Sequence, residues 1–304
     1  MVTFVTGPVR VSVPATTANL GPGFDSLGLA LALRDELEAE VTDSGLDIVV
    51  EGAGAEDVPR DESHLVVRAM RAAFAEMDAD PPGLRLSCRN VIPHARGLGS
   101  SSAAIVGGVS LACALVAGGS LLMDEEARFR LAARLEGHPD NVAPALHGGF
   151  VISGQEDEAF YAVGSAVDPR VAVVVFVPPT PVSTELARGL LPDRVPHADA
   201  AADAGRTALL VAALANQPEH LHLATRDYLH QEYRRAAMPE SLALVDRLRA
   251  DGVAAIVSGA GPTVLAFTDG PDHAAAATTA LLARCPEGWQ AQHLAVDRDG
   301  VRVG

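Results

Sequence analysis

The chain has 304 residues, 48% hydrophobic and 20% charged, enough to form the core of one large domain or two ordinary ones. Its net charge of −16 argues against nucleic acid and against an anionic membrane surface as partners. All 23 basic residues are arginine, which excludes Schiff-base lysines and lysine-based phosphate loops. The three cysteines are far apart and have no zinc-site spacing, which predicts a reduced, cytoplasmic protein.

The first half of the chain predicts strands and helices without a regular β–α–β order. Strands are expected at 9–13, 36–41, 46–51 and 84–91, and a helix at 63–77. The uncharged run 103–123 is long enough to span a bilayer, but glycines and serines dilute it. We therefore expect a buried central helix there. Asp124 is a suitable N-cap for a further helix, which should end at Gly137.

The second half predicts a buried strand at 171–177, helices within 198–249 with a break near Met238, strands at 253–257 and 263–267, and a last helix at 272–284. The least structured stretch is expected at 153–168. A domain boundary is therefore placed there, which gives domains at 1–160 and 161–304. The irregular order favours an α+β fold over a doubly wound sheet.

A glycine-rich turn that runs into a helix N-terminus is the strongest local signal. Such a turn lets the backbone approach an anion, which the free N–H groups and the helix dipole then bind. On its own the pattern is somewhat more typical of an ordinary serine-capped helix. The residues expected to bind phosphate are Pro93, Arg96, Gly97, Leu98, Gly99, Ser100, Ser101 and Ser102.

Three further loops carry polar groups in unusual density. Residues 14–25 (PATTANLGPGFD) suit either a ligand-facing turn or a solvent turn. Residues 258–263 (SGAGPT) suit a hairpin turn or a backbone surface beside a substrate. Residues 137–141 (GHPDN) can orient a hydroxyl group and manage its proton, although a His–Asp pair is more often structural.

Together and in this order, the four motifs resemble the GHMP small-molecule kinases over nearly the whole chain. HPDNVAP at 138–144 and HQEYR at 230–234 are most similar to the members that phosphorylate homoserine. The resemblance implies a ribosomal-protein-S5-like N-terminal domain and a ferredoxin-like C-terminal domain. It also implies ATP and Mg²⁺ as cofactors and L-homoserine as substrate. The product would be O-phospho-L-homoserine, used in threonine biosynthesis, and homodimers are common among these kinases.

The resemblance also implies roles for individual residues. ATP would lie in the glycine-rich loop, and Ser101 is expected to contact Mg²⁺. The catalytic residues implied are His138, Asp140 and Asn141. The substrate-binding residues implied are Asn19, Asp25, Thr184, Arg188, Arg234 and Gly259. An arginine suits such a role because its planar fork binds a carboxylate bidentately.

One position departs from the pattern of the resemblance. Counting back from His138 to the usual acidic Mg²⁺ ligand reaches Arg130, which would repel the cation. Glu126 lies one turn earlier on the same helical face. Altered Mg²⁺ dependence is therefore expected. Two alternatives stay open: a kinase for another hydroxy amino acid or amino alcohol, and a catalytically inactive regulatory protein, which Arg130 would favour.

Overall fold

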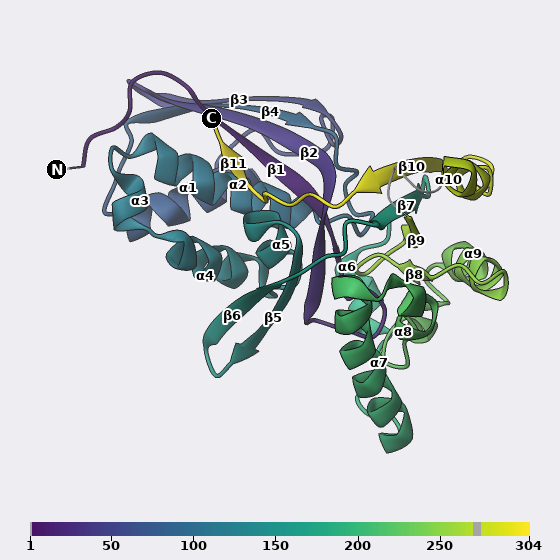
Figure 1. Ribbon diagram of the computed structural model, residues 1–304. Coiled ribbons are helices and arrows are strands. Elements are labelled where there is room, and N and C mark those ends of the chain that lie inside the picture. Colours follow the sequence, from purple (N-terminus) through teal and green to yellow (C-terminus); the bar gives the residue numbers. More distant parts are fainter. Residues whose placement is uncertain (1, 270–274) are drawn as a thin grey trace.

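The computed structural model describes residues 2–269 and 275–304, which form two sheets with helices packed on each (Figure 1). The first sheet contains β1 Val9–Ala18, β2 Leu27–Thr42, β3 Gly45–Gly52, β4 Gly83–Asn90, β5 Phe150–Glu156, β6 Ala159–Ser165 and β11 Arg302–Val303. The second contains β7 Val171–Val177, β8 Ala255–Val257, β9 Val264–Asp269 and β10 Gln290–Ala295. Strand pairing is antiparallel apart from β3 with β4, and the α+β prediction is confirmed.

Helices gather on one side of the first sheet (Figure 1). They are α1 Leu65–Glu76, α2 Ser100–Leu115, α3 Gly119–Leu122, α4 Glu125–Glu136 and α5 Val142–His147. The helices that follow are α6 Thr184–Gly189, α7 His197–Asn216, α8 Leu221–Ala224, α9 Pro239–Ala250 and α10 Ala275–Leu282. Short 3₁₀ turns lie at Pro218–His220 and Glu232–Arg234. The start of the helix expected at 272–284 lies outside the described residues.

The uncharged run near residue 110 forms a buried helix, as expected, but a shorter one. Helix α2 lies between the first sheet and helices α1 and α4, and most of its side chains are buried. It ends at Leu115, because Val116 is extended and bridges to Phe4. No helix within the described residues is long and apolar enough to cross a membrane. Asp124 caps α4 by accepting from the N–H of Ala127, and Gly137 ends it in the left-handed conformation, as predicted.

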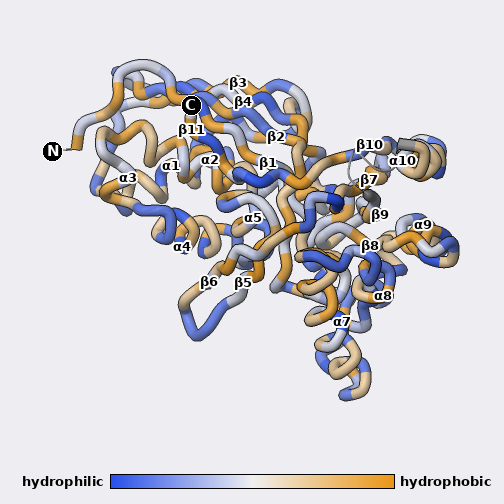
Figure 2. The backbone as a smooth tube through the Cα atoms, in the orientation of Figure 1, coloured by the Kyte–Doolittle hydropathy of each residue, from blue (hydrophilic) through white to orange (hydrophobic). Residues whose placement is uncertain are grey.

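Two expectations about the first sheet need correction. Strand β1 does not stop at Val13 but continues through Ala18, so the first five of the twelve residues at 14–25 are strand rather than turn. The stretch 153–168, expected to be the least structured, contains most of the β5–β6 hairpin. The hydrophilic tip of that hairpin hid its pairing in the sequence (Figure 2).

The chain divides between the sheets after β6 and then returns. Residues 161–165 still belong to the first sheet, and the second begins at Val171 with β7. After β10, Val296 bridges to Leu31 and β11 pairs with β1. The domain boundary at 160/161 therefore stays a prediction. The chain after this boundary also contributes strand β11 to the first sheet.

Both faces of β7 are covered, which explains its unbroken apolar sequence. Val173 packs into a core that includes α7 and α8, whereas Val174 packs into a second core formed with α9 and α10. A strand buried on both faces has no polar side to alternate with. The first of these cores also contains residues of the first sheet, so the two sheets share buried apolar contacts.

Candidate active site

The four motifs converge on one cavity of about 320 Å³ where the two sheets meet. The predicted site residues that line it are Asn19, Gly97, Gly99, Ser100, Ser101, His138, Asp140, Asn141, Thr184, Arg188, Arg234 and Gly259. They come from the loop after β1, the α2 N-terminus, the α4–α5 loop, α6, the 3₁₀ turn at Glu232–Arg234 and the β8–β9 turn. Most of the residues predicted from sequence are therefore brought together.

Glycines allow the phosphate-type loop to pack against the β8–β9 turn. Gly97 has a φ of +75°, and a Cβ there would collide with the carbonyl oxygen of Ser258. The Ser258 hydroxyl in turn donates to the Gly97 carbonyl at 2.6 Å. Gly99 has a φ of +70°, and a Cβ there would collide with Thr16 Oγ1. The SGAGP segment is thus a surface packed beside the loop as well as a hairpin turn.

The first turn of α2 points into the cavity without a side-chain cap. Gly99 is the N-cap residue, and no side-chain cap of α2 is found within residues 2–269 and 275–304. The alternative of an ordinary serine-capped helix is therefore not what the structure contains. Uncapped N–H groups at a helix N-terminus favour an anion.

An acidic residue that the sequence motifs did not indicate faces this turn. Glu136 Oε1 accepts hydrogen bonds from Ser101 Oγ at 2.6 Å and from Ser102 Oγ at 2.8 Å. Glu136 is the last residue of α4 and lines the cavity. Its position directly before Gly137, two residues from His138, is the signal that could have found it.

Arg130 is not at the site, which corrects the expectation of a cation at the metal position. Its Nε donates to Glu126 Oε1 at 2.9 Å, and both side chains are about half exposed. Arg130 lies six residues before Glu136 on α4, about 9 Å along the axis and on a different face. The fixed spacing back from His138 pointed to the wrong residue, because α4 extends to Glu136, only two residues before His138.

The HPDN loop holds its polar groups through local hydrogen bonds. His138 Nδ1 lies 2.8 Å from Asp140 Oδ1. Burial lowers the pKa of His138, but the hydrogen bond and charge of Asp140, helped by Glu136, outweigh it and leave a net rise. Thr16 Oγ1 donates to Asn141 Oδ1 at 2.8 Å. This contact fixes the amide plane of Asn141 at the cavity wall.

Two arginines meet on the other side of the cavity. Arg188 forms a bidentate pair with Asp25, with nitrogen–oxygen distances of 2.7 and 3.0 Å. The hydrogen bond to Asp25 raises the pKa of Arg188. Arg234 is only 1% exposed, and burial together with the charge of Arg188 lowers its pKa to about 10. Phe24 lies beside both, with its ring centroid 5.5 Å from each guanidinium carbon.

Several predicted site residues have other contacts. Arg96 donates to the carbonyl oxygens of Pro178, Pro179 and His94, so its guanidinium is bound to backbone. Asn19 donates to the Gly259 carbonyl at 3.0 Å and accepts from the Asp25 N–H at 2.9 Å, which joins two motifs. Asp25 meets the cavity through Arg188. Pro93, Leu98 and Ser102 do not line the cavity.

A second cavity, of about 280 Å³, opens on the other side of the α2 N-terminus. It shares Ser100 and Ser101 with the first cavity and is otherwise mainly apolar. His64 lines it and is 5% exposed, and its Nδ1 atom has no hydrogen-bond partner among the described residues. Burial lowers the pKa of His64, which keeps the ring neutral. His64 was not predicted from the sequence, because it carries no motif signal.

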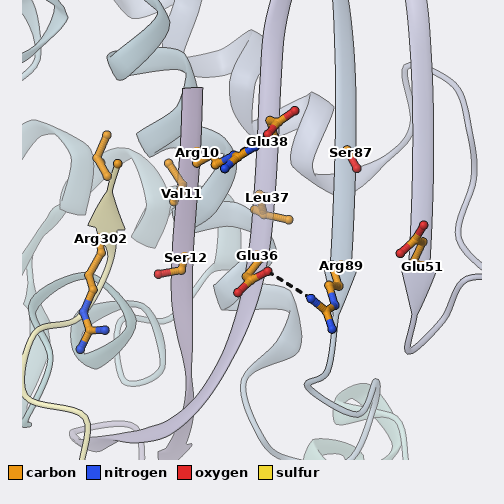
Figure 3. A pocket seen from close by; sticks show the side chains of 12 residues that line it. Arg10, Val11, Ser12, Glu36, Leu37, Glu38, Glu51, Ser87, Arg89 and Arg302 are labelled. Carbon is orange, nitrogen blue, oxygen red and sulfur yellow. Dashed lines mark hydrogen bonds and ion pairs between the residues drawn. The ribbon is translucent and has the colours of Figure 1, made fainter. Parts of the chain in front are cut away.

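A larger hollow, of about 490 Å³, lies on the open face of the first sheet (Figure 3). Four of its charged residues form two cross-strand pairs, Arg89 with Glu36 at 3.7 Å and Arg10 with Glu38 at 2.6 Å. None of the motif residues lines it. This hollow is therefore a solvated sheet face and not the site.

Comparisons with known proteins agree on one family. The model for the GHMP kinases N terminal domain matches residues 64–149, and the model for GHMP kinases C terminal matches 208–287. A homoserine kinase of Streptomyces avermitilis is 55% identical over 300 residues, 99% of this chain and 97% of that protein. One from Clavibacter michiganensis is 50% identical over 97% of this chain and 93% of that protein.

Solved structures show the same fold. The crystal structure of homoserine kinase from Cytophaga hutchinsonii has a TM-score of 0.85 at 25% identity and covers 98% of this chain and 97% of that one. L. major mevalonate kinase has a TM-score of 0.73 at 17% identity, over 98% of this chain and 99% of that one. The second likeness concerns the fold alone.

Proposed function

The chain belongs to the GHMP kinase family and, within it, to the homoserine kinases, and from this premise we propose how its site phosphorylates L-homoserine with ATP. The observation that carries the proposal is the meeting of two cavities at Ser100 and Ser101, with amino-acid-binding groups in one and an apolar chamber in the other. A phosphoryl donor and an acceptor can approach each other there. The product is O-phospho-L-homoserine, for threonine biosynthesis.

The substrate's charged groups match the far wall of the first cavity. Arg234 and Arg188 line the cavity and present guanidinium groups to the carboxylate. Asp25, which is paired with Arg188, is the carboxylate that we assign to the ammonium group. Thr184 lies on the same helix as Arg188 and also lines the cavity. These contacts place the hydroxyl end of homoserine toward the HPDN loop.

Asn141 and its neighbours hold the reacting hydroxyl. Because Asn141 Oδ1 accepts from Thr16, the amide N–H₂ group remains to hydrogen-bond the substrate oxygen. Asp140 is 2% exposed and hydrogen-bonds His138, which gives the departing proton a nearby network. Phosphoryl transfer depends more on position and charge than on a strong base.

The donor's phosphates fit the uncapped turn of α2. Backbone N–H groups of this turn and the hydroxyls of Ser100 and Ser101 are the anion-binding groups. The donor set also fits Mg²⁺, which proteins usually bind through one or two carboxylates together with substrate phosphates. Glu136 and Ser101 would hold the ion, which supplies charge neutralisation for the phosphates when bound.

The nucleoside belongs in the second cavity. Its mainly apolar lining suits a planar base, and the unpaired Nδ1 of His64 supplies a polar contact for it. A cytoplasmic location accords with three cysteines that form no disulfide.

The test is ADP release by the purified protein with ATP and Mg²⁺, with L-homoserine, L-threonine, L-serine and mevalonate as parallel acceptors. Turnover selective for homoserine is expected. Equal or better turnover with another acceptor would assign a different substrate. ATP binding without turnover would indicate a catalytically inactive regulatory protein. The main support for that alternative was Arg130 at the metal position, but Glu136 faces the serines instead.

A further inference from the structure

His230 is a fully buried histidine between two parts of the substrate site. It is 0% exposed and lies in the loop that leads to Arg234. Its Nδ1 is 2.7 Å from Arg234 Nη1, and its Nε2 is 2.7 Å from the Gly21 carbonyl oxygen. The ring therefore connects Arg234 to the glycine-rich motif that also carries Asp25.

The two partners define the tautomer of His230. A carbonyl oxygen can only accept, so Nε2 carries the proton and donates to Gly21. A guanidinium can only donate, so Nδ1 presents its lone pair to Arg234. A doubly protonated ring would lose the second bond and face a cation.

The other groups around the ring agree with a neutral state. Asp227 Oδ1 lies 3.7 Å from Nε2, but Asp227 also accepts the backbone N–H groups of Leu229 at 2.9 Å and Gln231 at 2.7 Å. Phe24 stacks at a tilt, with 5.1 Å between ring centroids. Burial lowers the pKa of His230, and the charge of Arg234 adds to this effect.

The neutral state of the His230 ring determines how much positive charge Arg234 keeps. Within the described residues, no acidic side chain is ion-paired with Arg234, whereas Arg188 is paired with Asp25. Arg234 instead donates from Nη1 to His230 and from Nε to the Ala187 carbonyl at 3.1 Å. A neutral acceptor orients the guanidinium without neutralising it, so its charge remains available to an incoming carboxylate.

Resting on the proposed function, we propose that His230 is a positioning residue for substrate selection, which holds Arg234 in place to bind the carboxylate of the α-amino acid. It acts through Arg234 and does not touch the reacting atoms. The effect of His230 on kcat/KM therefore depends on whether the molecule that is phosphorylated carries a carboxylate.

The matched variants are His230→Gln and His230→Asn. A glutamine can keep the donor to Gly21 but removes the acceptor at the Nδ1 position, and an asparagine can keep that acceptor and loses the donor. A hydrogen bond to a charged group is worth about 1.5–3 kcal/mol, which is about 10- to 100-fold. His230→Gln should raise the KM for L-homoserine by that factor, with kcat and the KM for ATP changed much less. His230→Asn should raise it distinctly less.

The discriminating probe is 3-amino-1-propanol, which is homoserine without its carboxylate. His230→Gln should lower kcat/KM for homoserine about tenfold or more, yet change kcat/KM for 3-amino-1-propanol by less than about threefold. A merely structural defect would lower both equally, and that result would overturn the proposal. Equal KM values for the Gln and Asn variants, or no rise in either, would also overturn it.

His222→Gln is the matched control, since His222 is a half-buried histidine of the same domain that contacts the Arg249 carbonyl, outside the cavity. Its KM for homoserine should stay at the wild-type value. If wild type itself does not phosphorylate homoserine, the proposed function fails. If wild type is active and the His230 variants keep its preference for a carboxylate, only the role of His230 fails.

Discussion

Replacing Glu136 by glutamine tests whether this residue handles the metal and the phosphates. The amide keeps the size of the side chain and an oxygen that can accept from Ser101 and Ser102, whose hydroxyls lie 2.6 and 2.8 Å from the carboxylate. What disappears is the negative charge. The variant therefore separates electrostatic from steric effects at the α2 N-terminus.

The expected magnitude follows from the charge that the carboxylate brings to the two serine hydrogen bonds and to the metal. Charge-assisted hydrogen bonds are about twice as strong as neutral ones, so both serine hydrogen bonds weaken. Removing a partner outside the ligand shell of a metal already costs about 10- to 100-fold in affinity, and removing a ligand charge should cost at least as much. We expect the Mg²⁺ concentration for half-maximal rate to rise by about 100-fold and kcat to fall.

The assay is a titration of the rate with Mg²⁺, with ATP binding measured calorimetrically with and without the metal. Metal-free ATP should bind as well or more tightly, because a negative charge near the phosphates has gone. Glu126→Gln, on the same helix, and Arg130→Glu should both match wild type. An unchanged Mg²⁺ response in Glu136→Gln, or a clear effect of Arg130→Glu, would refute the reasoning.

Three further perturbations have defined outcomes. Arg234→Lys should raise the KM for homoserine about 100-fold while the KM for ATP stays within about twofold, because lysine cannot reproduce the fork held by His230 and Ala187; equal effects on both substrates in steady-state kinetics would contradict this. Gly97→Ala should destabilise the fold by at least about 2 kcal/mol in urea unfolding, since a left-handed φ and a collision with Ser258 combine; an unchanged midpoint would show that the loop can move away. Asp35 is 5% exposed, and burial raises its pKa from 3.8 to about 6, so its contribution to stability is lost as pH rises between these values. Asp35→Asn can keep the contacts to the Val91 and Ile92 N–H groups. Its free energy of unfolding in urea should rise relative to wild type by up to about 3 kcal/mol between about pH 4 and pH 7. A difference that stays constant with pH would argue against the raised pKa.

Local sequence was informative where one residue type is physically required. The glycines of the α2 loop, the Asp124 cap and the Gly137 helix end were all predicted, because positive φ and end-capping leave few alternatives. The unbroken apolar run 171–177 likewise predicted a buried strand, and the structure covers it on both faces. The resemblance to known motifs then assigned residues far apart in the sequence to one site. Asn19 and Gly259 are an example, because Asn19 donates a hydrogen bond to the Gly259 carbonyl.

What was missed depends on contacts distant in sequence or on loop length. Glu136 meets Ser101 only because α4 ends two residues before His138, and a fixed spacing pointed to Arg130 instead. His64 has no motif signal, and only its unpaired Nδ1 inside a cavity marks it. The β5–β6 hairpin has a polar tip, so neither strand looked like part of a sheet. Arg96 was predicted to bind phosphate because of its place in the loop, but its guanidinium donates to backbone carbonyls that the sequence does not reveal.

The most direct measurement is ³¹P NMR of the purified protein with ATP, Mg²⁺ and L-homoserine, with L-threonine and L-serine in parallel samples. The account predicts loss of the γ-phosphate signal of ATP and growth of one phosphomonoester signal, coupled to the terminal methylene protons of homoserine, in the homoserine sample alone. Release of inorganic phosphate without a phosphomonoester, or a phosphomonoester formed equally well on another acceptor, would contradict it.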